Sequence, residues 1–282
     1  MKVFQTAHEI QQYLLDINGL KKSSVGFAPT MGALHAGHLS LIEASKKQSD
    51  ITVSSVFVNP TQFNDPGDYD KYPIQTDTDL EMLLKSGCDV AFVPAVQEIY
   101  PQGINEKPRI DLGFIGTTLE AAHRPGHFEG VVQVVKRLLE IVQPDKLFMG
   151  QKDFQQCMVV QRLIEVFELP VEMIICPTRR EADGLAMSSR NMRLNALERQ
   201  SAVKLSGALF EIKKRFKTED FQNLIKEQTD QLQKDPLINV EYIAIVNGKT
   251  LEPLKNYLPG ISIVALIAAK VGEIRLIDNI IL

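Results

Sequence analysis

Short β-rich runs alternate with helix-like segments over residues 1–176, and no other feature of the sequence limits the fold as strongly. The runs are VGFAP (25–29), ITVSSVFV (51–58), DVAFVP (89–94), DKLFMG (145–150) and PVEMIIC (170–176). Before the fourth run, one apolar stripe has helical spacing: Val131, Val134, Val135, Leu138 and Val142. Repetition of strand, helix and strand predicts an α/β fold with a doubly wound, Rossmann-like parallel sheet. Ligands bind such sheets beyond the carboxyl ends of the strands, so we look for a site in the segments that follow the runs.

The pattern changes near residue 196. Two charge-rich amphipathic segments, ALERQSAVKLSGALFEIKKRF and TEDFQNLIKEQTDQLQKD, precede three β-rich runs, NVEYIAIV, ISIVALIAA and GEIRLIDNIIL. We therefore expect two domains. Residues 1–176 would form the Rossmann-like nucleotide- and substrate-binding domain, and residues 177–282 a smaller α+β domain with helices and a three-stranded antiparallel sheet.

Composition and charge argue against several classes of protein. The chain has 31 basic and 35 acidic residues and no run of five basic residues, so we expect neither a nucleic acid nor an anionic membrane as partner. The first fifteen residues mix charged and amide side chains with apolar ones, which predicts a first helix and not a signal peptide. ISIVALIAA is too short to span a bilayer and is predicted as a strand. Three widely separated cysteines fit a reducing cytoplasm better than a disulfide framework or a zinc site.

The segment PTMGALHAGH, residues 29–38, follows the first run. Gly32 and Gly37 remove side-chain bulk, which would let backbone amides approach a phosphate at the start of a helix. His35 and His38 share one face of the turn and would offer imidazole donors to phosphate charge. Four of the five histidines lie in HAGH or in HRPGH (123–127), while neither a P-loop nor a G-x-G-x-x-G turn is present. A helix start with surface histidines remains an alternative, as does a zinc site, although the spacing suggests no third ligand.

Two later segments carry cations beside a predicted helix start. In GQKDFQQ (150–156), Lys152 is placed to reach an anion, whereas Asp153 and Gln156 also fit a capping box. In DGLAMSSRN (183–191), two hydroxyls and a guanidinium would grip phosphate oxygens. An ordinary helix cap is the alternative for this second segment.

The segments after the second run are polar and rich in turn residues. In VNPTQF (58–63), Asn59 and Gln62 would bind a small polar substrate, although Asn-Pro is also plain turn chemistry. NDPGDYDKYP (64–73) is predicted as a mobile loop and a possible lid. Asp77 and Asp79 would cap the next helix or hold Mg²⁺ together with phosphate.

Five motifs in order, PTMGALHAGH, NPTQF, RPGHFEGV, GQKDFQQ and DGLAMSSRN, resemble the pantothenate synthetases, a family of the nucleotidylyltransferase superfamily with His-x-Gly-His-like motifs. The resemblance runs from about residue 23 to residue 195. It implies a ligase in which ATP and (R)-pantoate form pantoyl adenylate and pyrophosphate, after which β-alanine gives pantothenate and AMP. It also implies a homodimer.

The resemblance assigns roles to residues already singled out. His35, His38, Lys152, Ser188, Ser189 and Arg190 would act on the phosphates during adenylation, with His38 as acid or charge stabiliser. The wider ATP site would add Met31, Gly32, Ala33, Leu34, Ala36, Gly37, Gly150, Gln151, Asp153, Arg179 and Met187. Gln62 and Gln156 would bind pantoate, while Asn59, Arg124 and His127 would shape the β-alanine side. Asp79 would be the Mg²⁺ ligand.

Three positions depart from the family pattern. Gln151 replaces a glutamate found in many relatives, Arg179 replaces a valine that packs near adenine, and Thr78 replaces the first residue of an acidic pair. Arg179 can keep its contact if that contact uses backbone atoms. Two other functions remain open at this point: a transferase of the same superfamily with a different acceptor, and a catalytically silent nucleotide-binding regulator.

Overall fold

The structure of the protein, a computed structural model, describes residues 1–21, 23–63, 67, 69, 72–105 and 108–282. Its contacts divide the chain into two compact units. The first unit contains Met1–Gly150 and Val159–Cys176, and the second contains Gln151–Met158 and Pro177–Leu282. A boundary at residue 176 would leave residues 151–158 in the first unit, whereas the structure groups them with the second. Whether 1–176 and 177–282 form two domains remains a prediction.

The first unit is built on a six-stranded parallel sheet with the strand order β1-β4-β3-β2-β5-β6. The strands are β1 (Lys2–Phe4), β2 (Val25–Thr30), β3 (Ile51–Val56), β4 (Val90–Phe92), β5 (Lys146–Gly150) and β6 (Glu172–Cys176). The doubly wound parallel fold predicted from the alternation is confirmed, and each of the five predicted runs overlaps one of these strands.

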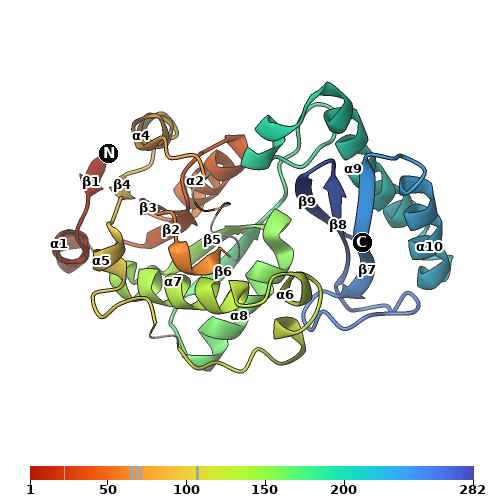
Figure 1. Cartoon of the computed structure of the whole chain (residues 1–282). Helices are drawn as coiled ribbons and strands as arrows, with labels where there is room; N and C mark the ends of the chain where they lie inside the picture. Colours follow the sequence, from red (N-terminus) through yellow and green to blue (C-terminus); the bar gives the residue numbers. More distant parts are fainter. Residues whose placement is uncertain (22, 64–66, 68, 70–71, 106–107) are drawn as a thin grey trace. The chain divides into compact units, whose positions relative to one another are not determined.

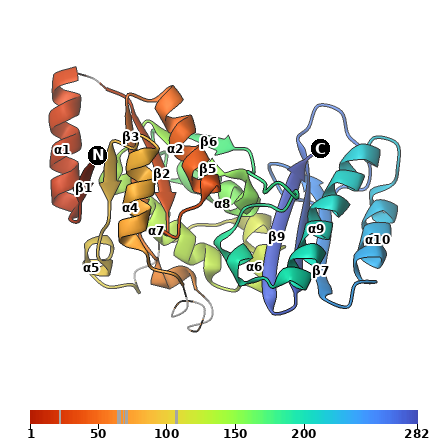
Figure 2. The ribbon, with the colours of Figure 1, turned by 90° about the horizontal axis from the view of Figure 1, so that it is seen from above.

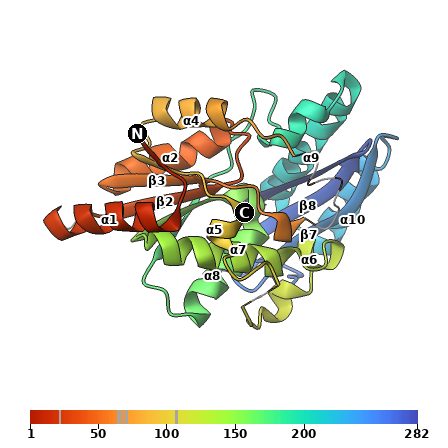
Figure 3. The same cartoon turned by 60° about the vertical axis from the view of Figure 1, so that its left-hand side comes forward.

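Helices cover both faces of this sheet. The helices are α1 (Ala7–Lys21), α2 (Ala36–Gln48), α4 (Thr76–Lys85), α5 (Val96–Ile99), α6 (Glu120–His123), α7 (His127–Val142) and α8 (Phe154–Val166). Figures 1 and 3 show α2 and α4 on one face and α1, α7 and α8 on the other. The strand order reverses between β2 and β5, and the loop that carries the two histidines starts at the carboxyl end of β2. This is the edge of a doubly wound sheet at which ligands bind.

The beginning of the chain differs from the prediction of a first helix. Lys2–Phe4 forms β1, which pairs in parallel with β4, and the helix starts only at Ala7. Three residues are too few to give a period-two pattern, and a pairing with residues about 90 positions away has no local signal. The sequence therefore could not distinguish β1 from the helix that follows it.

The second unit contains a three-stranded antiparallel sheet in the order β7-β8-β9, as predicted. The strands are β7 (Ile238–Asn247), β8 (Ile263–Val271) and β9 (Ile274–Ile281), and the long helices are α9 (Ala196–Arg215) and α10 (Phe221–Leu232). Figure 2 shows both helices beside this sheet, and their apolar residues share one buried core with it. Among the described residues, no helix is long and apolar enough to cross a membrane.

Candidate functional site

The two histidines of the loop after β2 form the start of helix α2. His35 is the N-cap residue, and its Nδ1 accepts a hydrogen bond from the Gly37 amide at 3.1 Å. His38 Nδ1 accepts one from the His35 amide at 3.3 Å, which completes a reciprocal capping box. The rings stack with centroids 4.0 Å apart. Since each Nδ1 is an acceptor, the proton of each neutral ring is on Nε2, and each ring presents an Nε2–H donor.

The backbone amides of this loop are engaged by the protein itself. Asp79 Oδ2 accepts from the Ala33 amide at 2.9 Å, and Asp79 Oδ1 accepts from the Leu34 amide at 2.8 Å. Gly32 makes this approach possible, because its φ of +83° suits glycine and a Cβ there would lie 2.8 Å from Asp79 Oδ2. The sequence predicted that loop amides would bind phosphate. In the structure, the amides of Ala33, Leu34, His35 and Gly37 donate to internal acceptors.

Asp79 lies in the first turn of α4 and is 1% exposed. It does not cap that helix, because the N-cap residue is Gln75, and neither does the exposed Asp77. Both Asp79 oxygens are committed to loop amides, which argues against the predicted role as a magnesium ligand. In the described part of the chain, no group of three or more His, Cys, Asp or Glu residues is arranged to hold a metal ion. The described residues therefore give no support to the zinc alternative for His35 and His38.

Asn59 is buried and is the N-cap residue of the turn η1 (Pro60–Gln62), which follows β3. Its Nδ2 donates to Gln62 Oε1 at 3.1 Å and to the Gly130 carbonyl at 3.2 Å, while its Oδ1 accepts from the Tyr100 hydroxyl at 2.7 Å. Burial raises the pKa of Tyr100 to about 12, so this hydroxyl stays a donor at neutral pH. Asn59 therefore fixes the turn and the position of Gln62.

Gln62 and His127 connect the turn to its surroundings. Gln62 Nε2 contacts Met31 Sδ at 3.0 Å, which links η1 to the histidine loop. His127 Nδ1 lies 2.8 Å from the Gln62 carbonyl, and Arg124 Nη1 lies 3.1 Å from His127 Nε2. A carbonyl only accepts and a guanidinium only donates, so this His127 is the neutral Nδ1–H tautomer. Five predicted residues, Met31, Asn59, Gln62, Arg124 and His127, thus form one connected network.

A close approach of η1 to helix α7 makes this network possible. A Cβ at Gly130 would lie 2.3 Å from the Thr61 carbonyl oxygen and 2.8 Å from Gln62 Cα. Only glycine lets the turn reach the helix at this distance. The second glycine of RPGHFEGV, Gly130, is therefore explained by packing against the turn.

In the second unit, Lys152 lies in the short turn η3 (Gln151–Asp153), directly before α8. Its side chain is 18% exposed, and its ammonium lies 3.5 Å from Asp153 Oδ1. The turn is bound by a residue that the sequence reasoning missed: Asn279 Nδ2 donates to the carbonyls of Gln151 and Lys152, both at 2.8 Å. Gln156 lies half-buried in the first turn of α8, and its capping box with Asp153 remains a prediction.

The loop with Ser188, Ser189 and Arg190 follows a tight hairpin in which Arg180 bridges to Ala186. Ser188 is the N-cap residue of η4 (Ser189–Arg193), and its Oγ accepts from the Arg190 amide at 3.3 Å. The helix-cap alternative therefore describes the Ser188 side chain correctly.

Arg179 is exposed, and its carbonyl accepts from the Met187 amide at 2.9 Å. Its backbone thus has a structural use that does not depend on its side chain.

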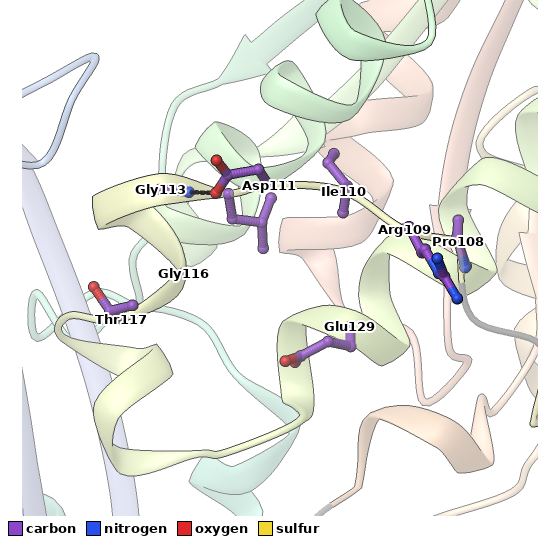
Figure 4. Close-up of a pocket in the computed structure, with 9 residues that line it drawn as sticks. Pro108, Arg109, Ile110, Asp111, Gly113, Gly116, Thr117 and Glu129 are labelled. Atoms are coloured by element: carbon purple, nitrogen blue, oxygen red, sulfur yellow. Dashed lines mark hydrogen bonds between the residues drawn. The ribbon is translucent and has the colours of Figure 1, made fainter.

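A cavity of about 620 Å³ lies elsewhere in the first unit, between the segment 108–117 and α7. Figure 4 shows Arg109 and Glu129 at its edge and the Asp111 carboxylate accepting from the Gly113 amide at 2.8 Å. None of the predicted site residues lines it. The predicted lid over 64–73 lies largely outside the described residues.

A sequence model of the pantoate-beta-alanine ligase family matches residues 2–281. The pantothenate synthetase of Cytophaga hutchinsonii is 46% identical over 267 residues, which are 93% of each chain. The pantothenate synthetase of Bacteroides fragilis is 41% identical over 280 residues, covering 99% of this chain and 98% of the relative.

Solved structures give the same result. The pantothenate synthetase of Thermus thermophilus superposes with a TM-score of 0.90 at 38% identity and 99% coverage of both chains. The pantoate-beta-alanine ligase of Francisella tularensis, complexed with beta-gamma ATP and beta-alanine, superposes with a TM-score of 0.83 at 35% identity, covering 100% of this chain and 97% of the relative.

Proposed function

The chain belongs to the pantoate-β-alanine ligase family, and we propose from this premise how its residues join (R)-pantoate to β-alanine with consumption of ATP. The protein is an ATP-dependent, AMP-forming acid-amine ligase whose product is pantothenate. The observation that carries the assignment of residues is the reciprocal capping of His35 and His38, which turns two imidazoles into Nε2–H donors at the carboxyl end of β2.

The reaction has two steps. A pantoate carboxylate oxygen attacks the α-phosphorus of ATP and the bond to pyrophosphate breaks, which yields pantoyl adenylate. The amine of β-alanine then attacks the acyl carbon, loses a proton, and expels AMP. No covalent nucleophile from the protein is needed, because the pantoate carboxylate is ionised at neutral pH. The protein contributes alignment and neutralisation of the charge that develops on the phosphates.

The histidine loop would supply the imidazole donors. We assign His38 to the stabilisation of charge on the ATP phosphates, with His35 beside it, because both Nε2–H groups are fixed by the bonds at Nδ1. The remainder of the loop, residues 31–37, would line the nucleotide. Its shape is set by Asp79 and Gly32.

Four further residues would supply cations and hydroxyls. Lys152, Ser188, Ser189 and Arg190 would bind phosphate oxygens, since an ammonium and a guanidinium both donate to anions and the guanidinium does so through a planar fork. Gln151, Asp153, Arg179 and Met187 would extend the nucleotide site, next to Gly150 in the chain.

Pantoate and β-alanine would be held by amide, guanidinium and imidazole groups. Gln62 and Gln156 are assigned to pantoate. Asn59 is saturated by internal hydrogen bonds, so it would act by fixing Gln62, whereas Arg124 and His127 would shape the β-alanine side. The Francisella tularensis relative, described with β-alanine and a nucleotide, supports these two substrates.

Magnesium is the one predicted cofactor whose ligand does not fit the geometry. Asp79 is buried, and both of its oxygens accept loop amides. We therefore assign Asp79 to the support of the histidine loop, and the residue roles given above do not depend on a metal.

We also propose a cytoplasmic homodimer. The location is supported by the odd number and wide separation of Cys88, Cys157 and Cys176, which do not suit a disulfide framework and which all lie buried. The dimer is supported by the family resemblance.

The test of the function is AMP production from ATP, pantoate and β-alanine, with each substrate omitted in turn. Pyrophosphate release should require pantoate but not β-alanine, and AMP release should require all three. In single-turnover reactions His38→Ala should slow adenylation about 100-fold, as expected for a lost transition-state donor. His8→Ala, which removes an exposed imidazole from α1, is the control. An unchanged rate in His38→Ala would remove that role, and a full set of substrates without AMP would favour a silent nucleotide-binding regulator.

A further inference from the structure

We propose that Asp278 and Asn279, neighbouring residues of β9, are positioning residues that anchor both phosphate-binding segments of the second unit. Asn279 would hold the turn that carries Lys152, and Asp278 would hold the hairpin that leads into Ser188–Arg190. This inference rests on the phosphate roles given above. Neither residue contacts the reacting atoms in this proposal: Asn279 acts through the backbone of η3, and Asp278 acts through the side chain of Arg180.

Asn279 makes three hydrogen bonds with two consecutive residues of η3. Its Nδ2 donates to the carbonyl oxygens of Gln151 and Lys152 at 2.8 Å each, and its Oδ1 accepts from Gln151 Nε2 at 3.1 Å. With both Nδ2 hydrogens and the carbonyl oxygen engaged, the carboxamide is matched to this turn. Because the bonds go to the main chain of Lys152, they fix the point from which its ammonium extends.

Asp278 binds the second segment through Arg180. Arg180 Nη1 and Nη2 donate to the Asp278 carboxylate at 2.6 and 3.0 Å, a bidentate pair. Arg180 Nη1 also donates to the Gly184 carbonyl at 3.1 Å, so the guanidinium binds the loop of its own hairpin. The same guanidinium reaches the Asn279 carbonyl at 3.3 Å, so the hairpin is bound to both residues of the pair.

The placement of these side chains is unusual for a strand that helps to form a core. Ile274, Leu276 and Asp278 follow the alternation of β9, and the two apolar members lie in the buried core of the second unit. Asp278 is 5% exposed and Asn279 is 2% exposed. Burial raises the pKa of Asp278, and the hydrogen bonds from Arg180 oppose that rise.

A buried carboxylate and carboxamide destabilise a core unless their partners are well placed. An apolar pair would fill the same strand positions without that cost. The polar pair therefore indicates a task beyond packing, and its partners lie in the segments with Lys152 and with Ser188–Arg190.

The test measures adenylation and amide formation separately in the intact protein. Adenylation is followed as pyrophosphate release in single turnovers of ATP and pantoate, and amide formation as pantothenate release from preformed pantoyl adenylate and β-alanine. Asn279→Ala should slow adenylation about 10- to 100-fold, the range expected when a reacting group is displaced by about 1 Å. Amide formation should stay within about twofold of wild type, since Lys152 acts in the first step. Asn279→Asp has the same size but replaces the Nδ2 donors with an acceptor, so it should slow adenylation as well.

Asn247→Ala is the matched control. Asn247 lies at the end of β7 in the same sheet, and its Oδ1 accepts from the amides of Lys249 and Thr250. Its loss removes two side-chain-to-backbone hydrogen bonds from a turn that carries no assigned site residue. It should lower the melting temperature while leaving the adenylation rate unchanged.

Lys152→Ala separates this inference from the assignment on which it rests. If Asn279 acts through Lys152, then Asn279→Ala should add little in a Lys152→Ala background, a coupling that two independent residues would not give. Additive slowing in the double variant would overturn the inference, as would an Asn279→Ala rate equal to that of Asn247→Ala. Wild-type adenylation in Lys152→Ala would instead overturn the phosphate role of Lys152 itself, and the role of Asn279 with it.

Discussion

At the scale of single residues, the loop after β2 offers imidazole N–H groups as hydrogen-bond donors, a function that backbone amides often have at ligand sites. The amides of Ala33 and Leu34 donate to Asp79, and those of His35 and Gly37 donate to the imidazoles. As a result, the loop after β2 keeps its shape by internal bonds and presents Nε2–H groups. The sequence showed two histidines in a suitable place, but their Nδ1 atoms as caps became visible only in the structure.

Asp79→Asn tests whether Asp79 supports the histidine loop by accepting hydrogen bonds from its amides. An asparagine has one acceptor oxygen, so one of the Ala33 and Leu34 amides would lose its partner in a buried place. We expect the free energy of unfolding to fall by about 1–3 kcal/mol and adenylation to slow. The apparent affinity for magnesium, measured by titrating the rate with Mg²⁺, should stay at the wild-type value.

The control is Asp77→Asn, which removes the same charge from an exposed position in the same helical turn. It should change neither stability nor rate. A specific loss of magnesium affinity in Asp79→Asn, rescued by excess metal, would return Asp79 to the role of metal ligand.

At the scale of elements, the close contact between η1 and α7 depends on Gly130, which has no Cβ atom. Glycine inside a helix is less stable than alanine at the same position. A glycine there is favoured when another segment of the backbone packs too closely to leave space for a Cβ atom. This holds for Gly130, since its α-carbon faces the Thr61 carbonyl. The turn thereby brings Asn59 and Gln62 to the helix that begins with His127.

Gly130→Ala should destabilise the protein by about 1–3 kcal/mol, because the added methyl group would overlap backbone atoms that cannot move without shifting η1. The matched variant is Gly207→Ala in α9, where a Cβ would meet nothing within 4 Å. That variant should stabilise the protein by about 0.5–1 kcal/mol from helix propensity alone. Urea denaturation gives both values, and equal signs for the two variants would contradict the packing argument.

At the scale of the whole molecule, each unit has its own buried apolar core, and polar contacts tie the elements of the second unit together. Asp235, between α10 and β7, accepts from Lys204 Nζ at 2.6 Å and from Ser201 Oγ at 2.7 Å, both on α9. These hydrogen bonds lower the pKa of Asp235 to about 2, and the bond from Lys204 has the largest effect.

The lowered pKa has a definite effect on the pH dependence of stability. The carboxylate stabilises the folded state at every pH above its ordinary value of 3.8, and this stabilisation is lost as the pH falls towards 2. Asp235→Asn should therefore have a lower melting temperature than wild type at pH 6, and the two curves should converge between pH 4 and pH 2. Lys204 is 55% exposed, so solvent screening reduces the size of the difference.

Asp230→Asn, which removes a charge from the exposed pair with Lys226, is the comparison. Its melting curve should follow wild type across the same pH range. A gap between Asp235→Asn and wild type that stays constant down to pH 2 would contradict the assigned cause.

The parts of the fold that repeat a local pattern could be predicted, and the parts that depend on distant partners could not. The five strand runs and the helix over Val131–Val142 carry their own periodicity, so their types followed from the sequence. β1 pairs with a strand about 90 residues away and has only three residues. Asp278 and Asn279 interrupt the apolar residues of the run GEIRLIDNIIL, and two adjacent polar residues inside such a run are a local signal for buried polar contacts.

The hydrogen bonds between Asn279 and Gln151 join residues that are 128 positions apart, and this sets the order in which the enzyme is completed. At a synthesis rate of about 5–20 residues per second, roughly 6–26 s pass between the appearance of the two partners on the ribosome. The loop of His35 and His38 needs Asp79, which follows Ala33 by only 46 positions. A nascent chain therefore acquires the support of its histidine loop well before the support of its lysine turn, and a pause in translation before β9 leaves a protein that has one anchor without the other.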